Sequence, residues 1–211
     1  MRIAIAAAAA SIAMGGWAVV TVKDLPEYFV AGQRYTIEFQ VRQHGRQLLS
    51  GLEPRLFVST SDPKLDEIDV PARALAAEGS YSATFTAPAA ARVVLTIKSG
   101  FGNSDLRLYP EPVVAAGASR PAMALAERGR VLFVAKGCNA CHVNGDLTDR
   151  PENQEVKVGP DLSGRRLARA YVIQKVKNPA SQVMPDLGLT DAEANALAAF
   201  IGSERAAAAG R

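Results

Sequence analysis

Two cysteines and a histidine in the second half of the chain have the types and the spacing that can do chemistry. Cys138 and Cys141 are separated by two residues, and His142 follows directly. Two thiols at this spacing can each form a thioether with a vinyl group of a haem, and the histidine can then bind the iron as proximal ligand. The same Cys-x-x-Cys pair could instead form a redox dithiol, half of a zinc site or a disulfide.

The rest of the chain argues against these alternatives. A zinc site needs two more cysteine or histidine ligands, whereas the chain has only two cysteines and one other histidine, His44. A thioredoxin-like motif lies between a strand and a helix of a βαβ unit. Here the motif ends a predicted helix and runs into the polar residues 144–157. The sequence therefore favours one covalently attached haem c.

The composition describes a globular protein that is long enough for two small domains. The chain has 211 residues, of which 48% are hydrophobic and 21% are charged. These fractions are typical of a folded chain and not of a disordered one. The formal net charge is +3, and neither half of the chain is basic enough to favour binding to nucleic acid.

The N-terminus predicts a signal peptide over residues 1–18. Arg2 is followed by an apolar stretch, and Gly16 and Ala18 supply the small residues of a cleavage site. The 20 residues between Arg2 and Lys23 carry no charge, so an uncleaved anchor that spans the membrane is the alternative. We expect a periplasmic protein, associated with the membrane only through such an anchor or through a complex.

Residues 19–112 have the pattern of an all-β domain. Residues 35–41 alternate strictly between apolar and polar side chains, as a half-buried strand does. Further short apolar runs are separated by Gly, Pro, Asn and Asp, and about seven strands predict an antiparallel, immunoglobulin-like sandwich. The strand order and the hairpin at residues 78–85 resemble the exported β-sandwich modules called FixH-like or YtkA-like. The expected role of this domain is docking or spacing.

A copper site in the predicted sandwich is not supported by its residues. Copper(I) prefers clustered methionine, histidine or cysteine ligands, and residues 19–112 contain His44 but no methionine or cysteine. We therefore interpret His44 as a residue of a hairpin loop. The Pro-, Ala- and Gly-rich residues 113–120 that follow the sandwich predict a linker.

Residues 121–205 are predicted to be helical, and residues 206–211 form an alanine-rich tail. Ser119 is the expected cap of a first helix whose first turn contains Pro121. This helix ends at Gly137, and its spacing predicts one apolar face composed of Leu125, Gly129, Leu132 and Phe133.

Two further helices are expected after the haem motif. One covers residues 167–177 and is stopped by Asn178 and Pro179. The last opens with a capping box between Thr190 and Glu193. It presents an apolar face to the first helix, consisting of Leu197, Phe200 and Ile201.

Together with the haem motif, three features make residues 121–203 resemble a monohaem class I cytochrome c. Gly129 and Phe133 match the small and aromatic residues with which the first helix contacts the last. Gly159-Pro160-Asp161-Leu162 matches the segment after the haem loop. Val183-Met184-Pro185 matches the signature of the distal ligand and lies 42 residues after His142.

The resemblance implies a haem iron with His142 and Met184 as its axial ligands. It also implies that the carbonyl of Pro160 accepts a hydrogen bond from Nδ1 of His142, which orients the ring and raises its basicity. Tyr171 is a candidate contact at the haem edge. The other methionines are less suited than Met184 as the second iron ligand, because Met1 and Met14 lie in the export segment and Met123 lies on the first helix.

A six-coordinate haem with a histidine and a thioether ligand transfers single electrons and has no free site for oxygen or peroxide. The sequence therefore predicts an electron carrier and not an enzyme. The expected partners are redox proteins or a membrane respiratory complex. A rim of basic residues could steer an acidic partner, or could be an ordinary solvated face: Arg165, Arg166, Arg169, Lys175 and Lys177.

Two other functions remain open from the sequence. The protein could be a haem enzyme or a ligand-binding haem protein in which Met184 does not hold the iron. It could also be an assembly or interaction protein in which the haem senses the redox state and the sandwich carries the function.

Overall fold

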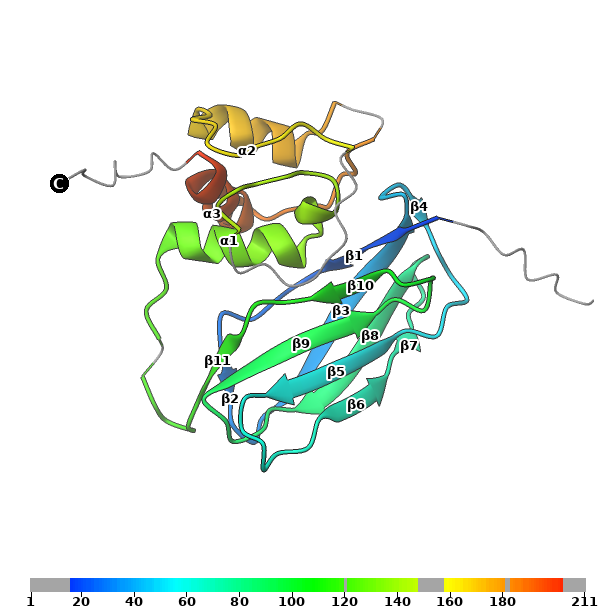
Figure 1. The fold of residues 1–211 in the computed structure, drawn as a ribbon, viewed down its shortest axis with the longest axis vertical. Helices are drawn as coiled ribbons and strands as arrows, with labels where there is room; N and C mark the ends of the chain where they lie inside the picture. Colours follow the sequence, from blue (N-terminus) through cyan, green and yellow to red (C-terminus); the bar gives the residue numbers. More distant parts are fainter. Residues whose placement is uncertain (1–15, 120, 148–157, 181–182, 203–211) are drawn as a thin grey trace, which may run out of the picture.

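A strand-rich part comes first along the chain, and a smaller helical part follows and lies beside it (Figure 1). This computed structural model describes residues 16–119, 121–147, 158–180 and 183–202. Most of the predicted signal peptide, residues 1–15, and the tail 206–211 lie outside the described residues. No helix within the described ranges is both long enough and apolar enough to cross a membrane.

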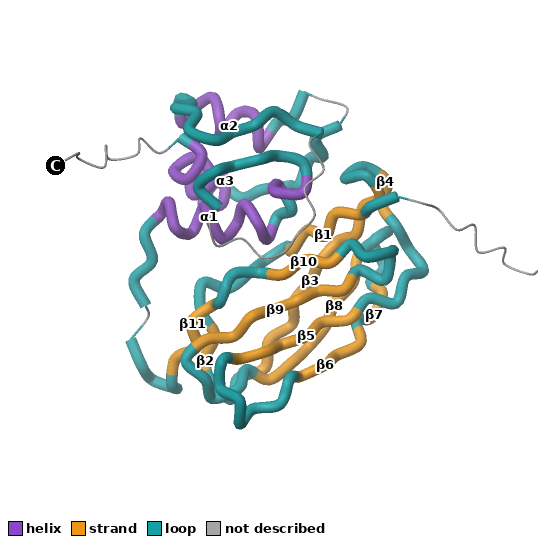
Figure 2. Tube along the Cα trace, viewed as in Figure 1, coloured by secondary structure: helices purple, strands orange, loops and turns teal. Residues whose placement is uncertain are grey.

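The strand-rich part consists of two sheets, one behind the other (Figure 2). The first has the order β1 (Ala18–Val22), β3 (Arg34–Gln43), β8 (Ser80–Thr86) and β7 (Arg73–Ala74), and β4 (Gln47–Leu48) also pairs with β3. The second has the order β2 (Phe29–Val30), β11 (Glu111–Val114), β9 (Arg92–Lys98), β5 (Arg55–Thr60) and β6 (Ile68–Pro71), and β10 (Asp105–Arg107) also pairs with β9.

The described residues contain more strands than the sequence predicts. Three of the additional strands, β2, β4 and β7, have two residues each, which is too short for an alternating pattern to reveal. Strands β2 and β11 pair in parallel, and the other strand pairs among the described residues are antiparallel.

The alternation along β3 explains how the first sheet packs. Ile37, Phe39 and Val41 are each at most 1% exposed, whereas Glu38 between them is half-buried. Phe39 stacks on Tyr81 of β8 with their ring centroids 5.9 Å apart. Burying each such side chain stabilises the fold by about 1.5–3 kcal/mol. The predicted strand at residues 35–41 is confirmed.

The predicted linker at residues 113–120 begins inside a strand. Strand β11 covers Glu111–Val114, lies between β2 and β9, and buries Glu111 and Val113. The strand has only four residues and one of them is Pro112, so its composition is that of a loop. At the other end, β1 starts at Ala18, the last residue of the predicted signal peptide, and pairs with β3.

The helical part contains α1 (Leu125–Ala135), the 3-10 turn η1 (Cys138–Ala140), α2 (Arg169–Lys177) and α3 (Asp191–Ile201). Helices α1 and α3 cross closely at Gly129, because a Cβ there would lie 2.0 Å from the carbonyl oxygen of Ala196. Phe133 and Phe200 meet beside this crossing with ring centroids 5.6 Å apart. The predicted capping box of α3 is confirmed, since Thr190 and Glu193 bond to each other's backbone N–H.

The predicted starts of the first two helices are too early. Helix α1 begins at Leu125, not near Ser119, and Ala124 caps it without a side-chain hydrogen bond. The chain uses the residues after β11 to cross to the helical part (Figure 1), so they are not available for the helix. Leu125 is 47% exposed and does not belong to the buried face. Helix α2 begins at Arg169 and not at residue 167, and it ends before Asn178 as expected.

Candidate haem-attachment site

The haem motif follows the C-terminus of α1 in one tight turn. Gly137 ends α1 in the left-handed region, with φ at 73°, which is a conformation that glycine adopts at little cost. The backbone N–H groups of Cys141 and His142 both donate to the carbonyl oxygen of Cys138, at 3.2 and 2.9 Å. This turn holds the two thiols and the imidazole within five residues of one another.

The two cysteines are free thiols in a partly buried position. Burial raises the pKa of Cys138 to about 12, the neighbouring Cys141 contributes to this shift, and burial also raises the pKa of Cys141. A redox dithiol works through a thiol whose pKa is lowered. The surroundings of the pair therefore do not favour dithiol chemistry.

His142 is held by the segment that follows residue 157. Its Nδ1 lies 2.9 Å from the carbonyl oxygen of Pro160. A carbonyl oxygen can only accept, so Nδ1 carries the proton and Nε2 keeps the lone pair that can bind a metal. Further along, the N–H groups of Gly159 and Leu162 donate to the carbonyl oxygens of Cys141 and Val143, both at 2.8 Å.

Gly159 permits a very close approach to the imidazole. A Cβ on Gly159 would lie 2.4 Å from Cε1 of His142 and 2.6 Å from its Nδ1. Every other residue type would have to displace the ring or the backbone. This role of Gly159 was not predicted from the sequence, and its place directly before Pro160 is the signal that could have identified it.

The donor set of this region fits a covalently bound haem. Two thiols at thioether spacing lie next to an imidazole whose Nε2 is available to an iron, and the hydrogen bond to Pro160 fixes the ring. Met184 lies on the segment that leads into α3, where it is half-buried and packs against the hydrophobic core. It comes from a different element than the cysteines and the histidine.

Tyr171 and the predicted basic rim lie on and around α2. Tyr171 is 49% exposed, and Nζ of Lys175 lies 5.6 Å from the centre of its ring. Lys177 forms an ion pair with Asp191 at the start of α3, which compensates its charge. The other basic residues of this region are exposed: Arg165, Arg166 and Arg169.

The strand-rich part also reaches the haem motif, which was not predicted from the sequence. His44 and Gly45 both have positive φ, at 52° and 72°, and form the turn between β3 and β4, so the interpretation of His44 as a hairpin residue is confirmed. A Cβ on Gly45 would lie 3.8 Å from Sγ of Cys141. More than ninety residues separate Gly45 from Cys141, and no local pattern reports such a distant contact.

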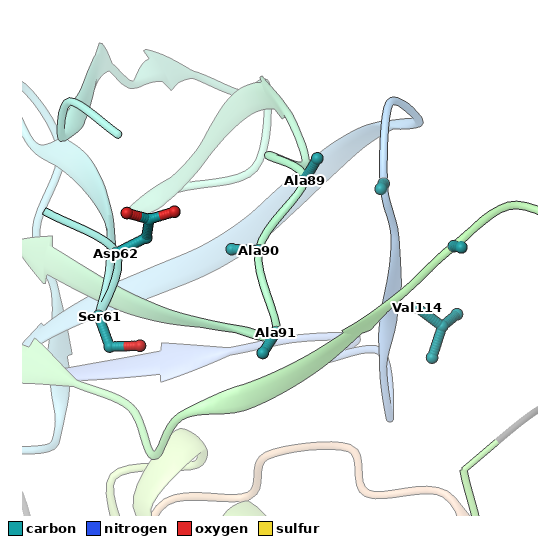
Figure 3. Close-up of a pocket in the computed structure, with 8 residues that line it drawn as sticks. Ser61, Asp62, Ala89, Ala90, Ala91 and Val114 are labelled. Atoms are coloured by element: carbon teal, nitrogen blue, oxygen red, sulfur yellow. The ribbon is translucent and has the colours of Figure 1, made fainter. Parts of the chain in front are cut away.

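A pocket of about 390 Å³ lies in the strand-rich part, formed by residues other than those of the haem motif. Figure 3 shows Asp62 beside the short run Ala89–Ala91 at this site. Apart from Ser61 and Asp62 its lining is apolar, and the carboxylate of Asp62 already accepts a hydrogen bond from the backbone N–H of Lys64 at 3.0 Å. This pocket therefore offers little polar chemistry.

The turn of two thiols and a histidine, the proline carbonyl that holds this histidine, and the crossing of α1 and α3 together define a cytochrome c domain. A family model supports this class and matches residues 124–201. That family is described as cytochrome c oxidase, cbb3-type, subunit III. The match covers the helical part and leaves the strand-rich part outside.

Comparison with solved structures gives only partial likenesses to the chain. The Lin-41 filamin domain has a TM-score of 0.37 at 16% identity, with 46% of this chain and 90% of that chain covered. The superoxide reductase (neelaredoxin) of Ignicoccus hospitalis has a TM-score of 0.33 at 15% identity, with coverage of 45% and 79%. Domains 4 and 5 of the S-layer protein SbsC have a TM-score of 0.30 at 16% identity, with coverage of 46% and 44%. No curated protein matches the chain.

Proposed function

We propose that this protein is an exported c-type cytochrome that carries single electrons through one haem c. Cys138 and Cys141 would attach the haem, and His142 and Met184 would bind its iron. The observation that carries the proposal is the 2.9 Å contact between Nδ1 of His142 and the carbonyl oxygen of Pro160, directly after the two free thiols. The charged N-terminus and the apolar stretch behind it support export to the periplasm.

The residues around the site would act by orientation and burial. A haem with histidine and thioether ligands supplies a one-electron centre without an open coordination position. Pro160 holds the ring of His142 so that Nε2 stays available to a metal, and Gly159 lets this segment lie against the ring. The crossing of α1 and α3 at Gly129 keeps the helical scaffold close-packed around the motif.

The partner is proposed to be a redox protein or a respiratory complex. The match of residues 124–201 to a family named for an oxidase subunit supports the second possibility. The exposed guanidinium groups of Arg165, Arg166 and Arg169 would favour an acidic surface on the partner. The sandwich would contribute a further docking surface.

Optical spectra of the oxidised and reduced protein, matured in a host that attaches haem, test the ligand assignment. We expect a low-spin wild-type spectrum with a weak far-red band from the bond between thioether and iron. This band should be absent in Met184→Ala and present in the control Met123→Ala, which removes a half-buried methionine that precedes α1. A high-spin wild-type spectrum, or a band that survives in Met184→Ala, would contradict the proposal.

Cyanide binding separates the electron carrier from a haem enzyme with an open distal site. A six-coordinate ferric haem must first release its methionine, so cyanide should bind slowly to the wild type and quickly to Met184→Ala. Fast binding to the wild type would favour the ligand-binding alternative.

A further inference from the structure

The two faces of strand β1 pack against different parts of the molecule. Side chains alternate along a strand. Val20 and Val22 are buried in the hydrophobic core, at 4% and 0% exposure. Val19 and Thr21 point to the opposite face, yet they are also buried, at 6% and 5%. An outer face of a sheet is normally solvated in such a domain, so something covers this one.

The C-terminal end of α1 and the haem motif provide that cover. The Thr21 hydroxyl lies 3.4 Å from the carbonyl oxygen of Lys136, to which it can donate. The Lys136 ammonium group donates to the carbonyl oxygen of Lys23 and forms an ion pair with Glu193 of α3 at 2.6 Å. The Lys136 side chain is only 3% exposed. One buried cation therefore joins the sandwich, the haem motif and α3.

Val19 lies between two glycines, one on each side of the junction. A Cβ on Gly137 would lie 2.4 Å from Cγ1 of Val19 and 2.9 Å from the carbonyl oxygen of Val20. A Cβ on Gly45 would lie 3.6 Å from Cγ2 of Val19 and 3.8 Å from Sγ of Cys141. The backbone of the haem motif is thus in direct contact with β1, next to the turn at His44 and Gly45.

We infer that the sandwich is a structural part of the haem site, in which β1 and the turn at His44 and Gly45 close the site on the side of Cys141. The inference rests on the proposed haem at Cys138 and Cys141. It makes Val19 a positioning residue that acts through Gly137 and the motif.

Closure by the sandwich has a consequence for the reduction potential. An apolar wall keeps water from the site and lowers the local dielectric, which disfavours the more highly charged ferric form. A haem closed by β1 and the turn at His44 and Gly45 should therefore have a higher potential than the same haem with water on that side. Loosening β1 at this point should lower the potential, although none of the altered residues ligates the iron.

The test compares two valines of the same strand in the full-length, haem-loaded protein. Val19→Ala removes methyl groups on the face toward the motif, and the control Val22→Ala removes them on the face toward the sandwich core, where Val22 is 0% exposed. The reduction potential is measured by spectroelectrochemistry. We expect a downward shift in Val19→Ala and none in Val22→Ala. Thr21→Val, which keeps the side-chain shape and removes the hydroxyl, should give a smaller shift in the same direction.

The outcomes separate this inference from the proposed function. A wild type that carries no covalent haem by mass spectrometry refutes the proposed function itself. A wild type with the expected spectrum whose potential is unchanged in both Val19→Ala and Thr21→Val overturns only the inference. Equal shifts in Val19→Ala and Val22→Ala would also overturn it, because a general loosening of the sandwich would then explain the effect.

Discussion

At the scale of single residues, the site depends on the close approach of Gly159 to the ring of His142. A Cβ there would lie inside the contact distance of three ring atoms, the closest of them at 2.4 Å. Neither partner can move freely. Nδ1 of His142 is hydrogen-bonded to the carbonyl oxygen of Pro160, and the N–H of Gly159 donates to the carbonyl oxygen of Cys141. The orientation of the imidazole therefore depends on the absence of a side chain.

Gly159→Ala should displace the ring or the segment and weaken the bond between His142 and Pro160, with an overpacking cost of about 1–3 kcal/mol. We expect a larger high-spin fraction in the ferric spectrum, or a lower yield of loaded protein. Gly145→Ala is the matched control, because a Cβ there would lie 3.4 Å from Ser163, close to ordinary contact. Identical spectra of Gly159→Ala and the wild type would show that the ring does not need this approach.

Gly45→Val should interfere with the thioether at Cys141, since a side chain at position 45 would begin 3.8 Å from Sγ. If attachment at Cys141 fails, one vinyl group stays intact, and the pyridine haemochrome band of the variant should shift to the red. Gly32→Val has a similar backbone strain, with φ at 79°, and no atom within 4 Å of its Cβ. The control should keep the wild-type band, and a variant at position 45 that does the same would contradict the prediction.

The sequence reveals the residues whose chemistry is local and misses those that act across the fold. Cys138, Cys141 and His142 lie within five consecutive residues, so their spacing can be recognised in the sequence. Pro160 was expected only because of a resemblance, and its carbonyl does lie beside Nδ1 of His142. Val19 and Gly45 lie far from the motif along the chain, and their side chains, one aliphatic and one absent, have no type that signals a haem.

At the scale of elements, the C-terminus of α1 is fixed from two directions. Lys136 pairs with Glu193 of α3 and donates to Lys23 at the end of β1. Closer to the middle of the helix, the guanidinium group of Arg128 donates to the carbonyl oxygens of Leu25 and Pro26. These contacts place α1 against both α3 and the strand-rich part.

Lys136→Met should destabilise the folded protein by roughly 1–3 kcal/mol, because the partly buried carboxylate of Glu193 loses its cation and keeps only its capping-box contacts with Thr190. The double variant Lys136→Met, Glu193→Gln removes both charges and should recover part of this loss. Urea unfolding curves at neutral pH measure both. The single variant Glu193→Gln completes the comparison. If the losses in unfolding free energy of the two single variants add up to the loss of the double variant, the two groups are independent.

Elements with a clear local sequence pattern were predictable, whereas short strands and the exact start of a helix were not. The alternation of β3 and the capping box of α3 are strong local signals, and both elements appear where the sequence places them. Strand β11 was hidden by Pro112 and by its length of four residues. The start of α1 was predicted too early because Ser119 and Pro121 are residues that often begin a helix. In the structure they belong to the connection from β11 to α1.

At the scale of the whole molecule, the strand-rich and helical parts meet at a buried acid. Glu111 on β11 is 1% exposed, and neither of its carboxylate oxygens has a hydrogen-bond partner within the described residues. Burial raises its pKa from 4.5 to about 7, although the positive charges of Arg128, Arg92 and Arg130 oppose the shift and Glu127 adds to it. Two of these arginines belong to α1, so this acid is sensitive to how the two parts meet.

The stability of the protein should fall as the pH rises from 4.5 to 7, the range between the ordinary and the folded pKa of Glu111. The folded state keeps a proton there that the unfolded state has lost, so the contribution is complete below pH 4.5 and gone above pH 7. A shift of this size corresponds to roughly 3 kcal/mol. Glu111→Gln should flatten this slope when urea unfolding is measured across the range. An equal slope in both proteins would assign it to other groups.

The strand-rich part, which ends with β11 at Val114, comes before the helical part along the chain. A chain that is synthesised from its N-terminus therefore presents all the strands, including β1 against which Gly137 packs, before residue 137 emerges. We expect the helical part to fold against these strands, because Lys136 and Gly137 contact β1. Since contacts between residues more than a hundred positions apart form slowly, we expect the two thiols to be accessible for attachment of the proposed haem before β1 covers this side of the motif.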